Sequence, residues 1–486
     1  MTGPALPSGP SGLSAARVLG YAAAGVGLVL AGILVARLND RSLVSITGAL
    51  ALAAASGLAV VGLRRRILSS PLVLLGVPLL ASLAAAMQPI TRIFQDWTPG
   101  GVLAITLIVL APIAGVLLAI AATDGLVPVP TAGTAEIAGE PRSRLLVVAC
   151  VGMTVVGTVV YATEWARVGG PPILSPNIDQ ARFALVGLGP LHVLTQGVPL
   201  ALLIAAWARV ARPDRFSSLE RRLLEAVIVF VPGMLVLSGS RTLVLMPLVA
   251  ALVVTVRHLS RKTVRRLLIV LPLTALVFAA GLQLARVGQL SGVQAPQAAL
   301  YSSSAQARAS PFEAGYNSLS ISLGEQLRVV SALYENDVST PPFSSSLWFV
   351  HHLFPRAINP HDVTVVYAGG WFTSMYAGQV FLDFGLLGTL VFGLILGAAA
   401  HLLYRRFAEG TSVRMIWIYA YLAGPLVLMF YINTFLFFVF PIIDLIGLYV
   451  LSRILIEEPA RQEVSSAARR APVGRWAVPT TRRSPG

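Results

Sequence analysis

The sequence predicts an all-α polytopic membrane protein, and composition, the length of its apolar stretches and the placement of its charges support this class. Of its 486 residues, 56% are hydrophobic and 12% are charged, a composition far from that of soluble globular domains. Many apolar stretches reach about 20 residues, the length of a helix that crosses a bilayer. The alternating segments typical of a membrane β-barrel are absent from the sequence.

The apolar stretches divide into about twelve predicted transmembrane helices. They lie near 18–36, 43–63, 67–87, 101–122, 145–165, 185–207, 223–239, 242–257, 267–285, 380–404, 415–434 and 436–455. The predicted organisation is a disordered N-terminus (1–15), helices 1–9 (16–285), a long polar loop (286–377), helices 10–12 (378–456) and a disordered basic tail (457–486).

The net charge of +15 is concentrated in short connections between apolar stretches, so it indicates orientation and not a nucleic-acid footprint. The arginine-rich connections are 64–66, 209–222, 258–266, 405–414 and the tail after Arg453. All fall on one side if both termini are cytoplasmic, which predicts an N-in, C-in protein of the cytoplasmic membrane. The weakest link is 123–144, where acidic residues offset the arginines.

The long loop is then extracytoplasmic. It carries the stretches FPRAINPHD (354–362) and GGWFTSMYAGQVFLDFGLLG (369–388). Within it, apolar residues recur at helical spacing, whereas Glu325 and Arg328 fall elsewhere on the helical wheel. The pattern predicts an amphipathic helix on the membrane or on the bundle. Its apolar positions are Leu319, Leu323, Leu327, Val330 and Tyr334.

Motifs of soluble enzymes are missing: the sequence has no GxxxxGK[ST], no GxGxxG after a strand, no HExxH and no paired CxxC. This disfavours a nucleotide-driven pump and a zinc enzyme, and we expect no cofactor. Cys150 is the only cysteine, so no intramolecular disulfide can form.

Three arginines on the predicted outer side are candidates for binding an anion. Arg182 lies in NIDQARF, Arg241 in SGSRT between two short apolar stretches, and Arg356 in FPRAINP. A guanidinium at a helix mouth is costly unless it reaches water or meets an anion. The structural alternatives are an interfacial arginine that caps helix-end carbonyls, for Arg241, and a loop ion pair with Asp179, for Arg182.

Histidines of the loop are candidates for proton transfer. His351 and His352 follow the apolar stretch LWFV and are placed to face a cleft, whereas His361 is equally compatible with a surface position beside Asp362. Their spacing does not match a usual metal site, so we predict no metal.

Two acids lie in or beside apolar stretches. Asp383 stands at the start of the tenth span, where a carboxylate favours the helix N-terminus. Asp444, in PIIDLIG, lies deeper and needs a partner or a proton; a proton relay and an arginine partner are both open. Four glycines of the tenth span are expected to allow close helix packing: Gly385, Gly388, Gly393 and Gly397.

Taken together, the ARF segment before the sixth span, SGSRT, the long late loop, FPRAINP and GGWFTSMYAGQVFLDFGLLG resemble the bacterial oligosaccharide repeat-unit polymerases. This is the O-antigen and exopolysaccharide polymerase family, related to the O-antigen ligases. The resemblance runs from about Ile173 to Tyr404 and rests on the order and sidedness of loose motifs. The first five spans match only as hydrophobic helices.

The resemblance implies a GT-C-like membrane glycosyltransferase that joins glycan units carried on polyprenyl pyrophosphate, such as undecaprenyl pyrophosphate, at the outer face of the membrane. Arg182, Arg241 and Arg356 would hold the pyrophosphate without a metal. His352 or His351 would accept the proton of the acceptor hydroxyl, with Asp383 or Asp362 behind them. The implied partners are the polyprenyl-pyrophosphate-linked oligosaccharide, the lipid bilayer, a flippase and a chain-length regulator, and no nucleic acid.

Three other classes remain open at this point. A transporter or flippase of lipid-linked glycan also fits twelve helices with both ends inside, although major-facilitator carriers have their long connection between the sixth and seventh spans, where this chain has a short one. A ligase would transfer the finished glycan to another acceptor. A structural scaffold is disfavoured by the charges concentrated at the outer side.

Overall fold

The structure is a computed structural model, and it describes part of the chain. The described residues are 40–65, 67–88, 97–123, 125, 140–175, 178, 181, 190–256, 258, 263, 311–337, 339, 342–343, 366–367, 370–371, 375–409, 412–431 and 440–457. These residues are mostly helical, with two short antiparallel ribbons. The ribbons pair β1 (Glu140–Pro141) with β4 (Ile456–Glu457), and β2 (Val366–Tyr367) with β3 (Gly370–Trp371).

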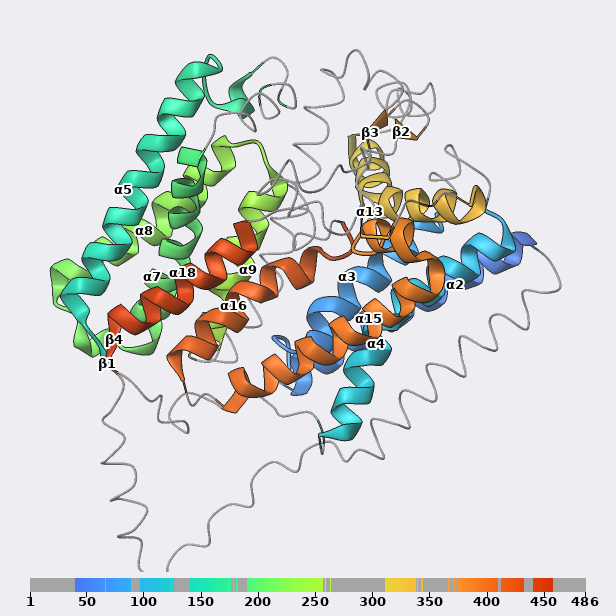
Figure 1. Cartoon of the computed structure of the whole chain (residues 1–486), viewed down its shortest axis with the longest axis horizontal. Coiled ribbons are helices and arrows are strands. Elements are labelled where there is room, and N and C mark those ends of the chain that lie inside the picture. The colour runs from blue at the N-terminus through green and yellow to red at the C-terminus, as the bar shows by residue number, and fades with distance from the viewer. Residues whose placement is uncertain are drawn as a thin grey trace, which may run out of the picture.

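The helices follow the apolar stretches of the sequence (Figure 1). They are α2 (Asp40–Arg65), α3 (Pro71–Ala86), α4 (Pro99–Ala122), α5 (Ser143–Arg167), η2 (Pro172–Leu174), η3 (Pro190–Gln196), α7 (Gly197–Ala211), η4 (Pro213–Arg215), α8 (Ser218–Leu237), α9 (Arg241–Val256), α13 (Pro311–Glu335), α15 (Gly378–Glu409), α16 (Val413–Leu428) and α18 (Phe440–Leu455).

Five of the described helical segments are long and apolar enough to cross a membrane: Leu43–Gly62, Pro99–Ala122, Ser143–Leu174, Leu191–Ala211 and Gly378–Glu409. Shorter apolar helices, such as α3, α9 and α16, accompany them. The helical membrane class predicted from composition is therefore confirmed at this level. The number of spans and their orientation in the membrane stay predictions.

Contacts between chain segments define two ends of the helix bundle. At one end, which we call the β1–β4 end, the pairing of β1 with β4 joins the start of α5 to the end of α18. At the other, which we call the α13 end, helix α13 packs against α3, α4 and α15. Figure 1 shows β2 and β3 at the upper right, α13 just below them, and β1 and β4 at the lower left.

Hydrogen bonds between distant segments fix both ends of α4. Its start meets α13 through Thr98, whose hydroxyl donates to Glu335 over 2.8 Å, while its far end meets the late part of α15, where Arg405 donates to the Thr123 carbonyl over 2.9 Å. Elsewhere in the bundle, the Tyr419 hydroxyl of α16 donates to the Ser69 carbonyl, just before α3, over 2.5 Å.

Helices α4 and α15 cross at short range because glycines remove the side chains between them. A Cβ atom at Gly397 would collide with the Pro112 backbone, one at Gly115 with the Leu394 backbone, and one at Gly393 would lie 2.9 Å from Ala111. Close packing is therefore confirmed for Gly393 and Gly397.

Gly385 departs from this expectation. Nothing would lie within 4 Å of a Cβ there, but its φ is +63° and its ψ is −163°, so the helix path breaks at this residue. A glycine reaches this conformation without the strain that other residues meet. Its role is to kink α15, and close packing is the wrong interpretation at this position.

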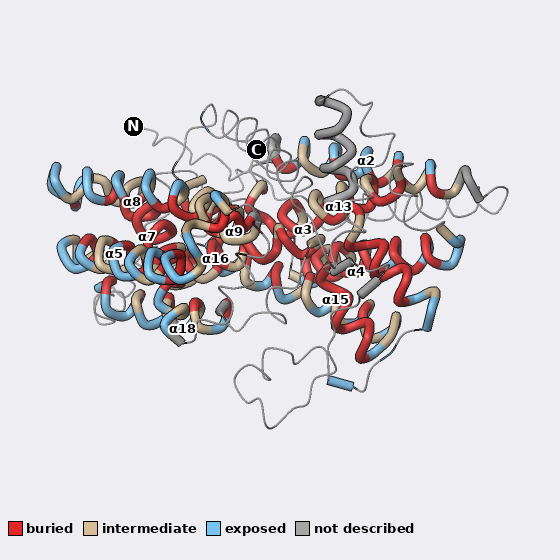
Figure 2. The backbone as a smooth tube through the Cα atoms, turned by 90° about the horizontal axis from the view of Figure 1, so that it is seen from above, coloured by how far each residue is buried: buried red, intermediate tan, exposed pale blue. Residues whose placement is uncertain are grey.

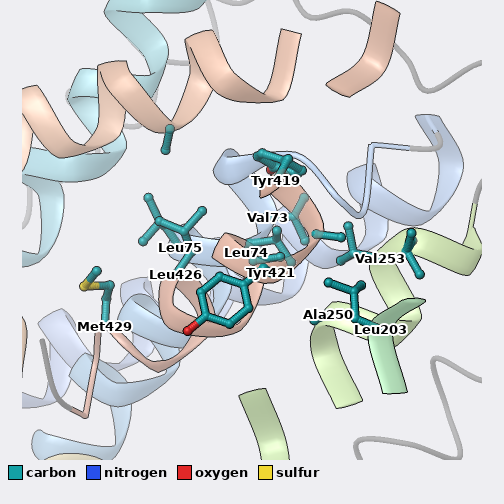
Figure 3. Close-up of a cluster of buried hydrophobic side chains, with 14 of the residues drawn as sticks. Val73, Leu74, Leu75, Leu203, Ala250, Val253, Tyr419, Tyr421, Leu426 and Met429 are labelled. Atoms are coloured by element: carbon teal, nitrogen blue, oxygen red, sulfur yellow. The ribbon is translucent and has the colours of Figure 1, made fainter. Parts of the chain in front are cut away.

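Helix α16 runs through the middle of the core. Figure 3 shows its residues Tyr419, Tyr421 and Leu426 among side chains of α3, α7 and α9, such as Leu75 and Leu203. The tube of Figure 2 is buried along the inner helices and exposed along the outer turns of α5 and α8. Those outer turns carry large apolar side chains, for example Val148, Val159 and Val229. An apolar outer surface of this kind suits lipid contact better than water.

Candidate functional site

Helix α13 forms inside the predicted long loop, but its described part is buried on more than one side, and Tyr334 of the predicted apolar face is 37% exposed. Leu327 and Val330 are fully buried, and α13 lies close against the end of α3. A Cβ at Gly324 would lie 2.7 Å from the Ala86 backbone, and the Ser82 hydroxyl donates to the Leu323 carbonyl over 2.5 Å. The helix thus packs on the mouth of the bundle and does not lie apart from it.

The polar side of α13 differs from the expectation. Arg328, placed off the apolar face by the helical wheel, is only 6% exposed, and its guanidinium lies 4.8 Å from the ring centre of Trp97. Trp97 is itself fixed, because its indole donates to the Ala86 carbonyl over 3.2 Å. Since the helix is covered on more than one side, wheel position alone could not predict which polar residue would be buried.

The end of α13 is held to the start of α4 by hydrogen bonds. Thr98 caps α4 by accepting from the Gly101 amide over 3.0 Å and donates to Glu335, which also accepts from Ser331 over 3.2 Å. A threonine cap of this kind satisfies a helix-end amide. These contacts fix the position of α13 over the helix mouths.

Asp383 lies in the first turns of α15, beneath this cover, and is 7% exposed. The segment before it is anchored, because the Tyr376 hydroxyl donates to the Ile108 carbonyl over 2.6 Å and the Tyr376 amide to the Met429 carbonyl over 2.7 Å. Gln379, one turn earlier, is also buried, and its Oε1 has no hydrogen-bond partner among the described atoms. Asp383 is thus a buried carboxylate just before the kink at Gly385.

Arg241 is the first residue of α9, and the structure describes its backbone. The SGSRT turn before it is tightly held: Gly239 has a φ of +66°, the Ser238 hydroxyl donates to the Leu235 carbonyl over 2.6 Å, and the Ser240 hydroxyl accepts from the Leu243 amide over 3.4 Å. The turn fixes the Cα position of Arg241 at the start of α9, and its predicted role in binding an anion stays a prediction.

The remaining predicted site residues lie outside the described residues. They are Arg182, His351, His352, Arg356, His361 and Asp362. The pyrophosphate clamp and the loop histidine therefore stay predictions.

A second polar group was missed from the sequence. His192 of η3 places its Nδ1 3.0 Å from each carboxylate oxygen of Glu164, which lies near the end of α5. Glu164 is 3% exposed. The signal was present, since an acid inside an apolar span is costly and usually functional, and the histidine of PLHVLTQG begins the next span.

Asp444 has a partner that the sequence did not indicate. The Tyr421 hydroxyl of α16 donates to its Oδ2 over 2.6 Å, and no arginine ion pair to it occurs in the described part. An arginine partner and a proton relay both stay open alternatives, because several arginine side chains lie outside the described residues. A tyrosine hydroxyl can hold a buried carboxylate without adding a second charge, which explains how α18 accommodates the acid.

Within the described ranges, no three His, Cys, Asp or Glu side chains gather in a way that could hold a metal ion. The metal-free site remains a prediction, because much of the long loop lies outside those ranges. The chain matches no family model, no curated protein and no solved structure.

Proposed function

We propose that this chain is a membrane glycosyltransferase that polymerises polyprenyl-pyrophosphate-linked oligosaccharide units into a cell-surface polysaccharide. In this proposal the α13 end faces outward from the cytoplasmic membrane, and about twelve spans leave both termini inside. The family resemblance of the motifs between about Ile173 and Tyr404 suggests the reaction.

One structural observation supports it most. Polar side chains from distant parts of the chain are buried or half-buried within the apolar bundle, among them the Glu164–His192 pair, Arg328, Asp383 and Asp444. Buried polar groups in an apolar bundle are costly and usually serve a function. A composite polar site suits a lipid-linked glycan, whose anchor stays in the bilayer while its sugars lie at the mouth.

The proposed chemistry follows from the substrate. The bond between the anomeric carbon and the pyrophosphate breaks, and charge develops on the leaving pyrophosphate. Arg182, Arg241 and Arg356 would stabilise that charge as permanently charged, planar donors. A histidine at the same end would take the proton of the acceptor hydroxyl, and Asp383 would support the site from below.

The decisive experiment uses purified protein in detergent and the lipid-linked oligosaccharide extracted from cells that lack this chain. We expect a ladder of products that differ by one repeat unit on gel electrophoresis. A carrier has no gradient to use in detergent, so unchanged chain length would contradict the proposal and favour transport. Transfer of a single glycan block to an added non-polyprenyl acceptor, without a ladder, would favour a ligase.

A further inference from the structure

A compact polar cluster lies where α5, η3 and α18 meet, and Tyr421 of α16 reaches it. Helix α18 contacts both α5 and η3. We call it the α5–η3–α18 cluster, and it comprises Tyr161, Glu164, Trp165, His192, Thr195, Tyr421 and Asp444. Because it involves the last turns of α5 and the first turns of α18, it lies away from the β1–β4 ribbon, which joins the start of α5 to the end of α18. None of these residues belongs to the predicted pyrophosphate clamp.

Glu164 orients His192. The Nδ1 atom lies at 3.0 Å from both carboxylate oxygens, a geometry that suits an Nδ1–H donor to Glu164 and would leave Nε2 to accept a proton. The Thr195 hydroxyl donates to the His192 carbonyl over 2.6 Å, which steadies the turn. The His192 side chain keeps 24% of its surface exposed, against 5% for Glu164, so a ligand can reach the ring.

Two buried polar atoms of the cluster have no hydrogen-bond partner among the described atoms: Oδ1 of Asp444 and Nε1 of Trp165. Asp444 is 3% exposed and Trp165 is 8% exposed. Each such atom costs about 1–3 kcal/mol when it stays unpaired. Oδ1 of Asp444 is an acceptor, and Nε1 of Trp165 is a donor.

Tyr161 connects these atoms with the histidine. Its ring centre lies 5.5 Å from that of Trp165 and 6.3 Å, edge-on, from that of His192. Helix α18, which carries Asp444, contacts both α5 and η3. The indole of Trp165 and the ring of His192 therefore flank one aromatic side chain, and the acceptor of Asp444 lies on the helix packed beside them.

A sugar fits this set of groups. A hydroxyl can donate to Asp444 and accept from Trp165, and a ring with several hydroxyls can do both while its apolar face lies on an aromatic side chain. A proton pathway would use carboxylates, histidine and hydroxyls. It would have no use for the indole N–H, which donates but does not exchange protons at neutral pH.

We infer that the α5–η3–α18 cluster binds the acceptor sugar and that His192 is the general base, an inference that rests on the proposed polymerase function. The acceptor O–H bond breaks and its proton passes to Nε2. The acceptor oxygen then bonds to the anomeric carbon of the donor, and the anomeric C–O bond breaks. Polyprenyl pyrophosphate leaves with the electron pair, and the proton is returned to solvent.

The first test is the ladder assay with His192→Ala and Glu164→Gln. We expect the rate to fall about 100-fold or more for His192→Ala and to recover partly when imidazole is added. His401→Gln is the matched control, because His401 is buried against Thr123 and belongs to no predicted site. Size-exclusion chromatography of each variant verifies the fold.

The second test measures binding without turnover. Oligosaccharide released from its lipid is titrated into the protein while tryptophan fluorescence is recorded. We expect a saturable change that disappears in Trp165→Phe, and an about tenfold higher Kd for Asp444→Asn, the loss of one hydrogen bond.

The outcomes separate the two proposals. A wild-type ladder with full activity in His192→Ala overturns the base assignment and leaves the polymerase proposal standing. Saturable binding without any ladder overturns the polymerase and supports the sugar site. No binding, together with proton uptake in proteoliposomes that Glu164→Gln abolishes, overturns the sugar site in favour of a proton relay.

Discussion

At the β1–β4 end, arginines lie in exposed ion pairs, whereas at the α13 end Arg328 is buried against Trp97. The exposed pairs include Arg142 with Glu457, at 3.1 Å, and Arg209 with Glu225, at 2.7 Å. The side chains of all four residues are roughly one third to two thirds exposed. Arg215 also pairs with Glu140. Solvated pairs of this kind contribute little to stability.

The same residue types thus have different physical consequences at the two ends. When the partner of a solvent-exposed arginine is removed, the protein loses little stability. In a covered site, a polar or charged group requires a partner or a ligand. We therefore expect substitutions at the α13 end to alter activity or stability strongly and matched substitutions at the β1–β4 end to alter them little.

The largest expected effect is on activity, at Arg241. Arg241→Lys should lower the polymerisation rate about 100-fold or more, since a point charge does not reproduce a planar, bidentate donor to pyrophosphate. The ladder assay measures the rate, and Arg142→Lys is the matched control at the other end. Equal rates for Arg241→Lys and wild type would remove Arg241 from the clamp.

The next effect is on stability, at Arg328. Arg328→Met should lower the free energy of unfolding by about 2 kcal/mol, because a desolvated cation over an indole ring is lost. Arg453→Met is the control, since Arg453 lies 5.7 Å from the Tyr449 ring centre and is exposed, and about 0.5 kcal/mol is expected there. Thermal unfolding in detergent measures both, and equal losses would argue against the contrast between the ends.

A smaller effect is expected for the pair between Glu140 and Arg215. Glu140→Gln should change the free energy of unfolding by less than about 1 kcal/mol, and the change should shrink as salt is added. Unfolding at two ionic strengths measures this. A decrease of several kcal/mol in the free energy of unfolding that does not depend on salt would mean that the charges at the β1–β4 end are buried and stabilise the fold.

No effect is expected from chelators. If arginines alone stabilise the pyrophosphate, EDTA should leave the ladder of the purified protein unchanged. Inhibition by EDTA that Mg²⁺ or Mn²⁺ reverses would require a metal at the α13 end.

Much of the architecture could be predicted from the sequence, because hydropathy is a local property. The apolar stretches that the structure describes are helices, and Gly393 and Gly397 predicted a close helix crossing. In each case the physical cause lies within a few turns of one helix. The lone Cys150 was likewise placed in an apolar span, and it is buried.

The buried polar groups could not be predicted in the same way. Glu164 meets His192 across a connection, Asp444 meets Tyr421 across two helices, and Arg328 is buried because α13 is covered on more than one side. Periodicity indicates which side chains avoid water, but not which polar groups from separate helices come together. The sequence by itself determined a helical membrane protein, and only the tertiary structure decided which charges share a buried environment, because that depends on how the helices pack.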